Sequence, residues 1–275
     1  MCDRKEGSVI VEEKQTIEDV FAGILADYFA MCNVEPFPVN IRIVEDMWQG
    51  YLEIRPDHAE KSSKDMEEFQ KNNNGTAVPP KNYEEAFTIL LHKEYVAKSV
   101  ENNSADWIGT LVHEAVHVND FIQFSKLVDV TDYDIILDRR NYRLFHLWTE
   151  FNAKAKGYYF LRKYTFGDKQ DAEQVQYIIE TELPYHINNM FEAYHATNNG
   201  DQQMYYIVHF IGRMYIWQKL FPEYFTVKAI RDMFSANKWM YELYIFLTTH
   251  TKLEDAYRDF EDMKKILQQN FSWVE

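Results

Sequence analysis

The sequence predicts an α+β chain that is predominantly helical, with a few strands in its N-terminal part and only helices in its C-terminal part. The chain has 275 residues but only 9 glycines and 7 prolines, which favours long regular elements. Strand-like runs occur only before residue 100, and the later apolar residues recur at helical spacing. Because 46% of the residues are hydrophobic and 16% are aromatic, we expect a buried core and not a disordered chain.

The first hundred residues mix helical and strand-like patterns. Thr16 is placed to cap a helix, and Asp19 three residues later completes a variant of the capping box. The polar segment 56–82 predicts a surface excursion that could cover a cleft. Four runs predict strands, the last two of which could form one strand or a pair: residues 39–44, 50–54, 86–92 and 95–97.

Two strong helices are expected next, followed by a helical C-terminal part. The first helix begins after Ser104, a good N-cap, and is apolar on several sides, as a helix buried between layers would be. An acidic connection over residues 128–141 leads to the second. Residues 165–171 are the best candidate for a domain boundary, which divides the chain into residues 1–165 and 166–275. Helices are predicted in the second part at about residues 172–197, 202–220, 226–248 and 252–271.

Net charge, hydropathy and cysteine content indicate which partners and which cellular compartment to expect. The formal net charge of −15 argues against a nucleic-acid partner, because phosphate contacts need a surplus of Lys and Arg. No window is long and apolar enough to span a bilayer, so no membrane partner is expected. Cys2 and Cys32 lack metal-type spacing and are interpreted as free thiols in a reducing compartment. With a polar start that lacks a signal peptide, these features predict a cytoplasmic protein of undetermined oligomeric state.

The most specific pattern is a His-Glu-x-x-His motif within residues 111–118. On a helix, His113 and His117 are one turn apart and project from the same face. Two imidazoles at that spacing can hold one zinc ion, and Glu114 lies beside them to polarise a water molecule. The motif has an apolar frame, as a buried active-site helix requires: Leu111, Val112, Ala115, Val116 and Val118.

A catalytic zinc site usually has three protein ligands, so a third is needed. The metzincin extension would place Gly and His where this chain has Asp120 and Gln123, which excludes that class. Glu150 on the next strong helix is the better candidate, because small residues on its face let two helices pack closely. His146 is the fallback ligand.

The element order resembles the gluzincin branch of the zincin-type metallopeptidases, in which a second helix donates a Glu ligand. Within that branch the chain is similar to the compact ImmA/IrrE-like peptidases, which have an N-terminal helix and strands before the motif. The resemblance covers roughly residues 16–165 and rests on the motif, the element order and Glu150. It implies a zincin-like metallopeptidase domain over residues 1–165 and a helical domain over residues 166–275 that frames or regulates the cleft.

The resemblance also implies a reaction, the hydrolysis of peptide bonds with one Zn²⁺ per chain. His113, His117 and Glu150 would be the metal ligands. Glu114 would be the general base toward the zinc-activated water and then the proton donor to the leaving amine. The substrate, a peptide or protein, would pair in extended form with the edge of the strand near residues 87–92.

Two supporting roles remain to be filled. Asp120, one turn beyond His117, is placed to orient an imidazole. A Tyr or His should stabilise the oxyanion, and several residues qualify: Tyr158 and His195, and also His186, Tyr194 and His209.

Three alternatives stay open. Glu114–His117 and Glu192–His195 are both Glu-x-x-His pairs, and with Glu150 they could form a di-iron carboxylate site. The aromatic C-terminal half could instead belong to a non-catalytic helical interaction or regulatory protein. The motif could also be a coincidence on a core helix.

Overall fold

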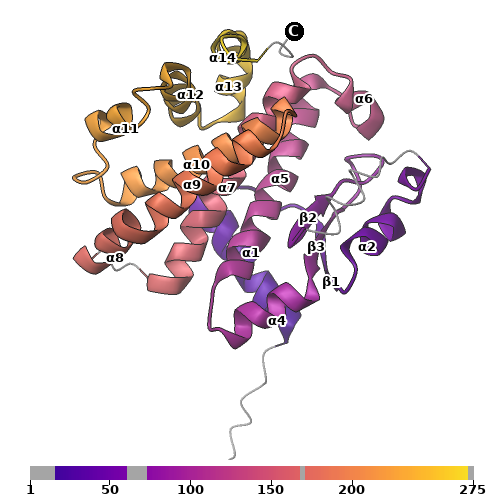
Figure 1. Cartoon of the computed structure of the whole chain (residues 1–275). Coiled ribbons are helices and arrows are strands. Elements are labelled where there is room, and N and C mark those ends of the chain that lie inside the picture. The colour runs from indigo at the N-terminus through magenta and orange to yellow at the C-terminus, as the bar shows by residue number, and fades with distance from the viewer. Residues whose placement is uncertain (1–15, 61–72, 168–170, 272–275) are drawn as a thin grey trace, which may run out of the picture. The chain divides into compact units, whose positions relative to one another are not determined.

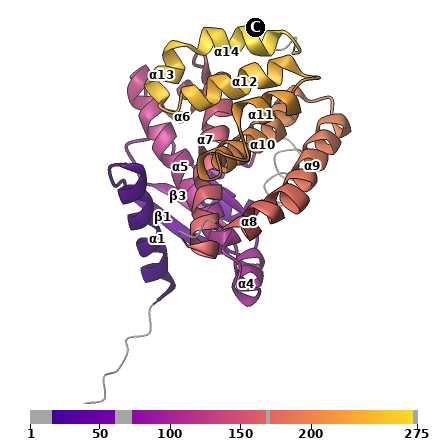
Figure 2. The same cartoon turned by 90° about the vertical axis from the view of Figure 1, so that its left-hand side faces the viewer.

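The structure, a computed structural model, describes residues 16–60, 73–167 and 171–271 (Figures 1 and 2). Its contacts divide the chain into two compact units, Met1–Pro36 and Phe37–Glu275. The first unit contains one helix, α1 (Ile17–Cys32), among its described residues. The expected capping box is present: the Thr16 hydroxyl accepts a hydrogen bond from the Asp19 backbone, and the Asp19 carboxylate accepts one from the Thr16 backbone. The division at residues 165–166 remains a prediction.

The second unit contains a small mixed sheet with strand order β1-β3-β2. Its strands are β1 (Val39–Val44), β2 (Gly75–Val78) and β3 (Phe87–His92). β1 pairs in parallel with β3, and β2 pairs with β3 in antiparallel. The predicted strands at residues 39–44 and 86–92 are thus confirmed. β2 was not predicted; it lies in the segment expected to be a surface excursion, of which residues 61–72 are outside the described chain.

The other two predicted strands are wrong, because both runs are helical. Residues 50–54 belong to α2 (Met47–Ile54), whose first turn is capped by the Asp46 carboxylate. Residues 95–97 belong to α4 (Lys93–Glu101), which starts directly after β3. In both short runs the apolar residues fit either period, and tertiary packing selects the helix.

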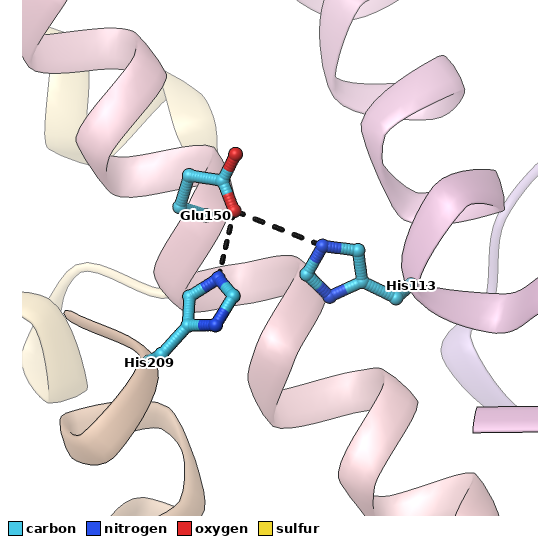
Figure 3. Close-up of side chains that lie close together, drawn as sticks. All are labelled: His113, Glu150 and His209. Carbon is cyan, nitrogen blue, oxygen red and sulfur yellow. Dashed lines mark hydrogen bonds and ion pairs between the residues drawn. The ribbon is translucent and has the colours of Figure 1, made fainter. Parts of the chain in front are cut away.

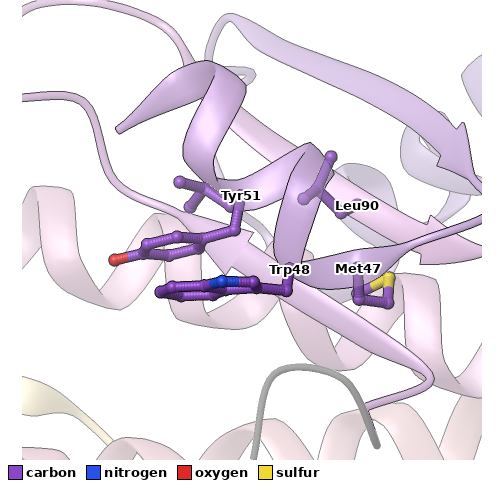
Figure 4. Close-up of a cluster of buried hydrophobic side chains, with 5 residues drawn as sticks. Met47, Trp48, Tyr51 and Leu90 are labelled. Carbon is purple, nitrogen blue, oxygen red and sulfur yellow. The ribbon is translucent and has the colours of Figure 1, made fainter. Parts of the chain in front are cut away.

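Packing of α2 on the sheet explains the first of these corrections. Trp48 and Tyr51 of α2 lie against Leu90 of β3 in a buried apolar cluster that also includes Met47 and Val78 (Figure 4). The Trp48 and Tyr51 rings are stacked with centroids 5.7 Å apart. A helix with residues i and i+3 on one face can form this cluster, whereas a strand would put them on opposite faces.

Two long helices form the centre of the second unit, α5 (Asp106–Val128) and α7 (Tyr142–Phe166) (Figure 1). α5 packs on β2 and β3, and α7 packs along α5. The two helix backbones approach closely at a pair of glycines. A Cβ atom added to Gly157 would lie 2.5 Å from the Gly109 carbonyl oxygen and 3.0 Å from the His113 Cβ atom. Only glycine allows this separation.

The rest of the described chain is helical, as the sequence predicts. α10 (Gly200–Leu220) packs on α7, where Gly212 permits contact with the α7 backbone: a Cβ there would lie 3.0 Å from the Phe151 carbonyl oxygen. A short π-helical turn, η2 (Ile178–Glu182), joins α8 to α9, in which Pro184 is near the first residue. No helix of the described chain is long and apolar enough to cross a membrane. The remaining elements are η1 (Pro56–His58), α6 (Tyr133–Leu137), α8 (Ala172–Tyr177), α9 (Leu183–Ala196), α11 (Val227–Met233), α12 (Lys238–Thr249), α13 (Leu253–Arg258) and α14 (Phe260–Gln268).

Candidate metal centre

Three helices bring metal-ligating side chains to one point. His113 of α5, Glu150 of α7 and His209 of α10 form a group that could hold a metal ion (Figure 3). The Glu150 Oε2 atom lies 2.9 Å from the His209 Nε2 atom and 3.7 Å from the His113 Nε2 atom. His209 was one of several oxyanion candidates in the sequence, and nothing in the sequence placed it beside Glu150, 59 positions away.

The second histidine of the motif belongs to the same cluster. The His117 Nε2 atom lies 3.0 Å from the His113 Nε2 atom and 3.6 Å from the Glu150 Oε2 atom. Ligand atoms held 2.0–2.1 Å from one zinc ion in a tetrahedral arrangement lie roughly 3.3–3.4 Å apart. The distances within the His113–His117–Glu150 triangle bracket that value, so its two imidazoles and one carboxylate fit a single ion.

Helix packing accounts for this convergence. The motif spacing puts both histidines on the side of α5 that faces α7. Close approach at Gly109 and Gly157 then lets Glu150 reach them, because Gly157 is two turns further along α7. Gly212 has the same role for α10, one turn after His209.

A hydrogen-bonded relay fixes the orientation of the His117 ring. The Thr149 hydroxyl donates to the Asp120 Oδ2 atom at 2.8 Å, and the Asn152 amide donates to the same oxygen. Because its proton is given to Asp120, the Thr149 oxygen accepts from the His117 Nδ1–H group at 3.1 Å. The Nε2 atom of His117 therefore faces His113 and Glu150, and its lone pair would bind a metal ion that displaced the proton there. Asp120 orients an imidazole as expected, but it does so through Thr149.

The charges within the group are strongly coupled. Burial disfavours the charged form of His117, but the Glu150 carboxylate outweighs it and raises the pKa of His117 to about 9. The same pairing holds the pKa of Glu150 well below its ordinary value despite its burial. Burial lowers the pKa of His113 well below the ordinary value and that of His209 to about 4, so these two rings are neutral. In the absence of a metal ion, the extra proton on His117 therefore balances the negative charge of Glu150. A bound metal cation would take over that role.

Glu114 lies beside the possible metal-binding side chains, and strand β2 holds its carboxylate in place. Its Oε2 atom accepts a hydrogen bond from the Ala77 N–H group of β2 at 2.8 Å. Burial raises the pKa of Glu114 to about 7. A carboxyl group with a pKa near neutrality can both accept and return a proton.

Two neighbouring pockets share His113 and Glu114 in their walls. The first, of about 430 Å³, has a polar wall that includes Lys154, His186 and Arg213. The second, of about 260 Å³, has an aromatic wall formed by Tyr51, Phe121, Tyr133 and Tyr142, and it also contains His117 and Glu150. Tyr205 lines both pockets.

Two of the predicted supporting residues make their contacts with other residues. Tyr158 lines the first pocket, but its hydroxyl donates to Glu182 and accepts from the Trp217 indole. His195 is exposed on α9, where its ring stacks on Phe191. The fallback ligand His146 is closer, with its Nε2 atom 3.9 Å from the Glu150 Oε1 atom.

The di-iron alternative needs Glu192 and His195 next to Glu114. Both residues are exposed on α9, whereas Glu114 is buried. The group of possible metal ligands among the described residues includes neither.

Sequence reasoning missed Tyr205. Its ring centroid is 3.9 Å from that of His209, one turn later on α10. Among the described residues its hydroxyl has no hydrogen-bond partner. The only signal in the sequence was the i, i+4 spacing of Tyr205 and His209, which is common in helices.

Comparison of the chain with protein-family models, curated proteins and solved structures finds no match. Functional assignment therefore depends on the geometry of the site.

Proposed function

We propose that this chain is a zinc-dependent peptidase in which His113, His117 and Glu150 hold one zinc ion and Glu114 is the general base. The observation that carries the proposal is the three ligand atoms 3.0–3.7 Å apart with the Glu114 carboxyl group between two pockets beside them. Two imidazoles and one carboxylate are a ligand set typical of catalytic zinc.

Zinc, when bound, lowers the pKa of a coordinated water and polarises a carbonyl oxygen. Hydrolysis adds hydroxide to the carbonyl carbon and a proton to the amine nitrogen as the C–N bond breaks. Glu114 accepts the proton from the attacking water and delivers it to the amine. The Ala77 N–H group holds one oxygen of Glu114 and leaves the other free for this transfer.

The substrate backbone would lie along β2. The strand named in the sequence prediction, β3, is paired on both edges, by β1 and by β2. β1 and β2 are the edge strands, and β2 is the one beside the site, because Gly75, Thr76 and Ala77 line the second pocket together with Glu114. An extended peptide can pair with such an edge by main-chain hydrogen bonds.

Tyr205 is the residue that we propose donates a hydrogen bond to the developing oxyanion. It lines both pockets, and burial keeps its pKa well above the ordinary value, so the hydroxyl stays protonated. A donor placed where charge develops can contribute a factor of about 10²–10³ to the rate.

A second candidate function is a closed, non-catalytic metal site. The observation that favours it is the position of the His209 Nε2 atom, 2.9 Å from the Glu150 Oε2 atom. As a fourth ligand, His209 would leave no open position for water, which is the arrangement of structural zinc sites. As a hydrogen-bond donor to Glu150, it would leave that position open.

Peptide cleavage by the zinc-loaded chain tests the proposal. A mixture of unstructured peptides is incubated with the wild-type chain and with Glu114→Gln and Tyr205→Phe, and products are identified by mass spectrometry. We expect Glu114→Gln to retain zinc and to lose at least about 100-fold in rate. Tyr205→Phe should also retain zinc, with a smaller loss. Zinc retention without cleavage by the wild-type chain would favour the closed site. Equal cleavage by Glu114→Gln would refute the role of Glu114.

A further inference from the structure

Two basic side chains face the first pocket without an acidic partner. Lys154 of α7 and Arg213 of α10 line this pocket together with His113, Glu114 and His209. Neither makes an ion pair within 4.0 Å or a hydrogen bond with any described residue. The packing at Gly212 explains why they are neighbours: a Cβ atom added to Gly212 would lie 3.1 Å from the Lys154 Cβ atom.

A positive charge without an acidic partner loses solvation free energy when it is partly buried. The two cations lack such a partner among the described residues although acidic residues outnumber basic ones in this chain. It contains 44 acidic and only 29 basic residues. The carboxylates of Glu182 and Asp106 also line this pocket. Glu182 is held by the Tyr158 hydroxyl and by Arg162, and Asp106 is exposed and makes no ion pair within 4.0 Å with Lys154 or Arg213. Burial, and secondarily the charge of Arg213, lower the pKa of Lys154 well below its ordinary value. An anion between the two side chains would remove this repulsion.

The two pockets differ in this respect. The second pocket contains neither Lys154 nor Arg213, and its wall is largely aromatic. His113 and Glu114 lie on the boundary between the pockets. A substrate that spans both would therefore meet positive charge on one side of the reacting bond only.

We infer that Lys154 and Arg213 form a subsite for a carboxylate of the substrate, next to the metal centre. The inference rests on the proposed peptidase function. The guanidinium group can bind a carboxylate through two parallel hydrogen bonds, and the ammonium group adds a third donor. In a peptide the carboxylate has two sources, the free C-terminus or an Asp or Glu side chain near the cleaved bond. The first source makes the protein a carboxypeptidase, and the second makes it an endopeptidase that prefers acidic residues.

Matched peptides distinguish the two sources. The zinc-loaded full-length chain is given three N-acetylated hexapeptides: one of neutral residues with a free C-terminus, its C-terminal amide, and an amide with one internal Glu. We expect at least about tenfold higher kcat/KM for one carboxylate-bearing peptide than for the neutral amide. The peptide that is preferred identifies the source. Equal values for all three would overturn the inference.

Variants assign the preference to the two cations. Arg213→Gln and Lys154→Gln should each reduce the preference for the carboxylate, mainly through KM. Lys219→Gln, which removes an exposed lysine from the same helix as Arg213, is the matched control and should leave it unchanged. Loss of rate on all three peptides alike would indicate a structural role for the cations and contradict the subsite.

Binding separates this inference from the proposed function. The three peptides are titrated into zinc-loaded Glu114→Gln by calorimetry, so that no cleavage is needed. Tighter binding of a carboxylate peptide, reduced by Arg213→Gln, supports the subsite even if the wild-type chain cleaves nothing. Equal dissociation constants would overturn it even if the wild-type chain is an active peptidase.

Discussion

His117 is restrained at both ring nitrogens. Its Nδ1–H group donates to Thr149, which in turn donates to Asp120, and its Nε2 atom faces His113 and Glu150. Such support of a metal ligand fixes its tautomer and raises its basicity. Each member of this relay is buried, so no water replaces a lost partner.

Removal of the Thr149 hydroxyl should therefore weaken metal binding. Thr149→Val keeps the shape of the side chain, but it leaves His117 Nδ1–H without an acceptor. We expect zinc affinity to fall about 10–100-fold, measured by competition with a chromogenic chelator. Thr149→Ser keeps the hydroxyl and should behave like the wild-type chain. Unchanged affinity in Thr149→Val would show that the relay does not support the ligand.

Arg55 is a buried positive charge close to the second pocket, whose wall includes Tyr133. Its guanidinium group binds both carboxylate oxygens of Asp57, at 3.0 and 2.8 Å, and lies over the Tyr133 ring. The hydrogen bonds from Arg55 lower the pKa of Asp57 from 3.8 to about 2. A depressed carboxyl pKa stabilises the fold above the unfolded-state pKa, and that stabilisation is lost as pH falls from about 4 toward 2.

The difference in unfolding free energy between the wild type and Asp57→Asn should follow this pH dependence. At pH 7 we expect the variant to be less stable by about 1 kcal/mol, a value reduced for solvent screening because the Asp57 side chain is 37% exposed. By pH 2 the difference should shrink toward zero. Urea unfolding at both pH values measures it, and a difference independent of pH would contradict the ion pair.

At the scale of the elements, the site depends on how closely three helices approach. α5, α7 and α10 each supply donor atoms, and glycines stand where the backbones come closest. A helix interior normally disfavours glycine by about 1 kcal/mol relative to alanine. At Gly157 that preference is reversed by the contact with the Gly109 carbonyl oxygen, a backbone atom that cannot rotate away.

Gly157→Ala should consequently destabilise the protein and weaken metal binding together. The added methyl group meets backbone at 2.5 Å, so α5 and α7 must separate, at a cost of about 1–3 kcal/mol. Gly23→Ala in α1 is the matched control, because its added Cβ would meet nothing within 4 Å and should not reduce stability. Chemical unfolding and zinc titration measure both effects. A more stable Gly157→Ala would contradict the proposed close contact.

The same helices show what could be predicted from the sequence. The motif helix, the β3 strand and the capping box of α1 each depend on a local pattern, and all three were predicted. β2 has four residues and exists only through its pairing with β3. His209 and Arg213 reach the site because α10 packs on α7, and no local pattern encodes that contact.

At the scale of the whole molecule, a bound metal would join helices that are distant in sequence. His113 and Glu150 come from different helices, so an unfolded chain does not offer the same site. A ligand that binds only the folded state stabilises it, by about 2.7 kcal/mol at a free concentration 100 times its Kd. The net charge of −15 adds self-repulsion that a divalent cation partly offsets.

Metal removal should therefore lower the thermal unfolding midpoint. For a chain of this size the expected shift between chelator-treated and zinc-saturated protein is roughly 5–10 °C. His113→Ala should show a much smaller shift under the same conditions, which controls for zinc bound elsewhere. Identical midpoints with and without zinc would exclude a metal that links these helices.

Metal content tests most directly whether His113, His117 and Glu150 hold one zinc ion. Elemental analysis of the purified chain, of Glu150→Ala and of the exposed-residue variant Lys219→Gln gives metal identity and stoichiometry. We expect close to one zinc per chain in the wild type and Lys219→Gln, and loss of zinc in Glu150→Ala. Two irons per chain, or no metal after incubation with zinc, would contradict the claim.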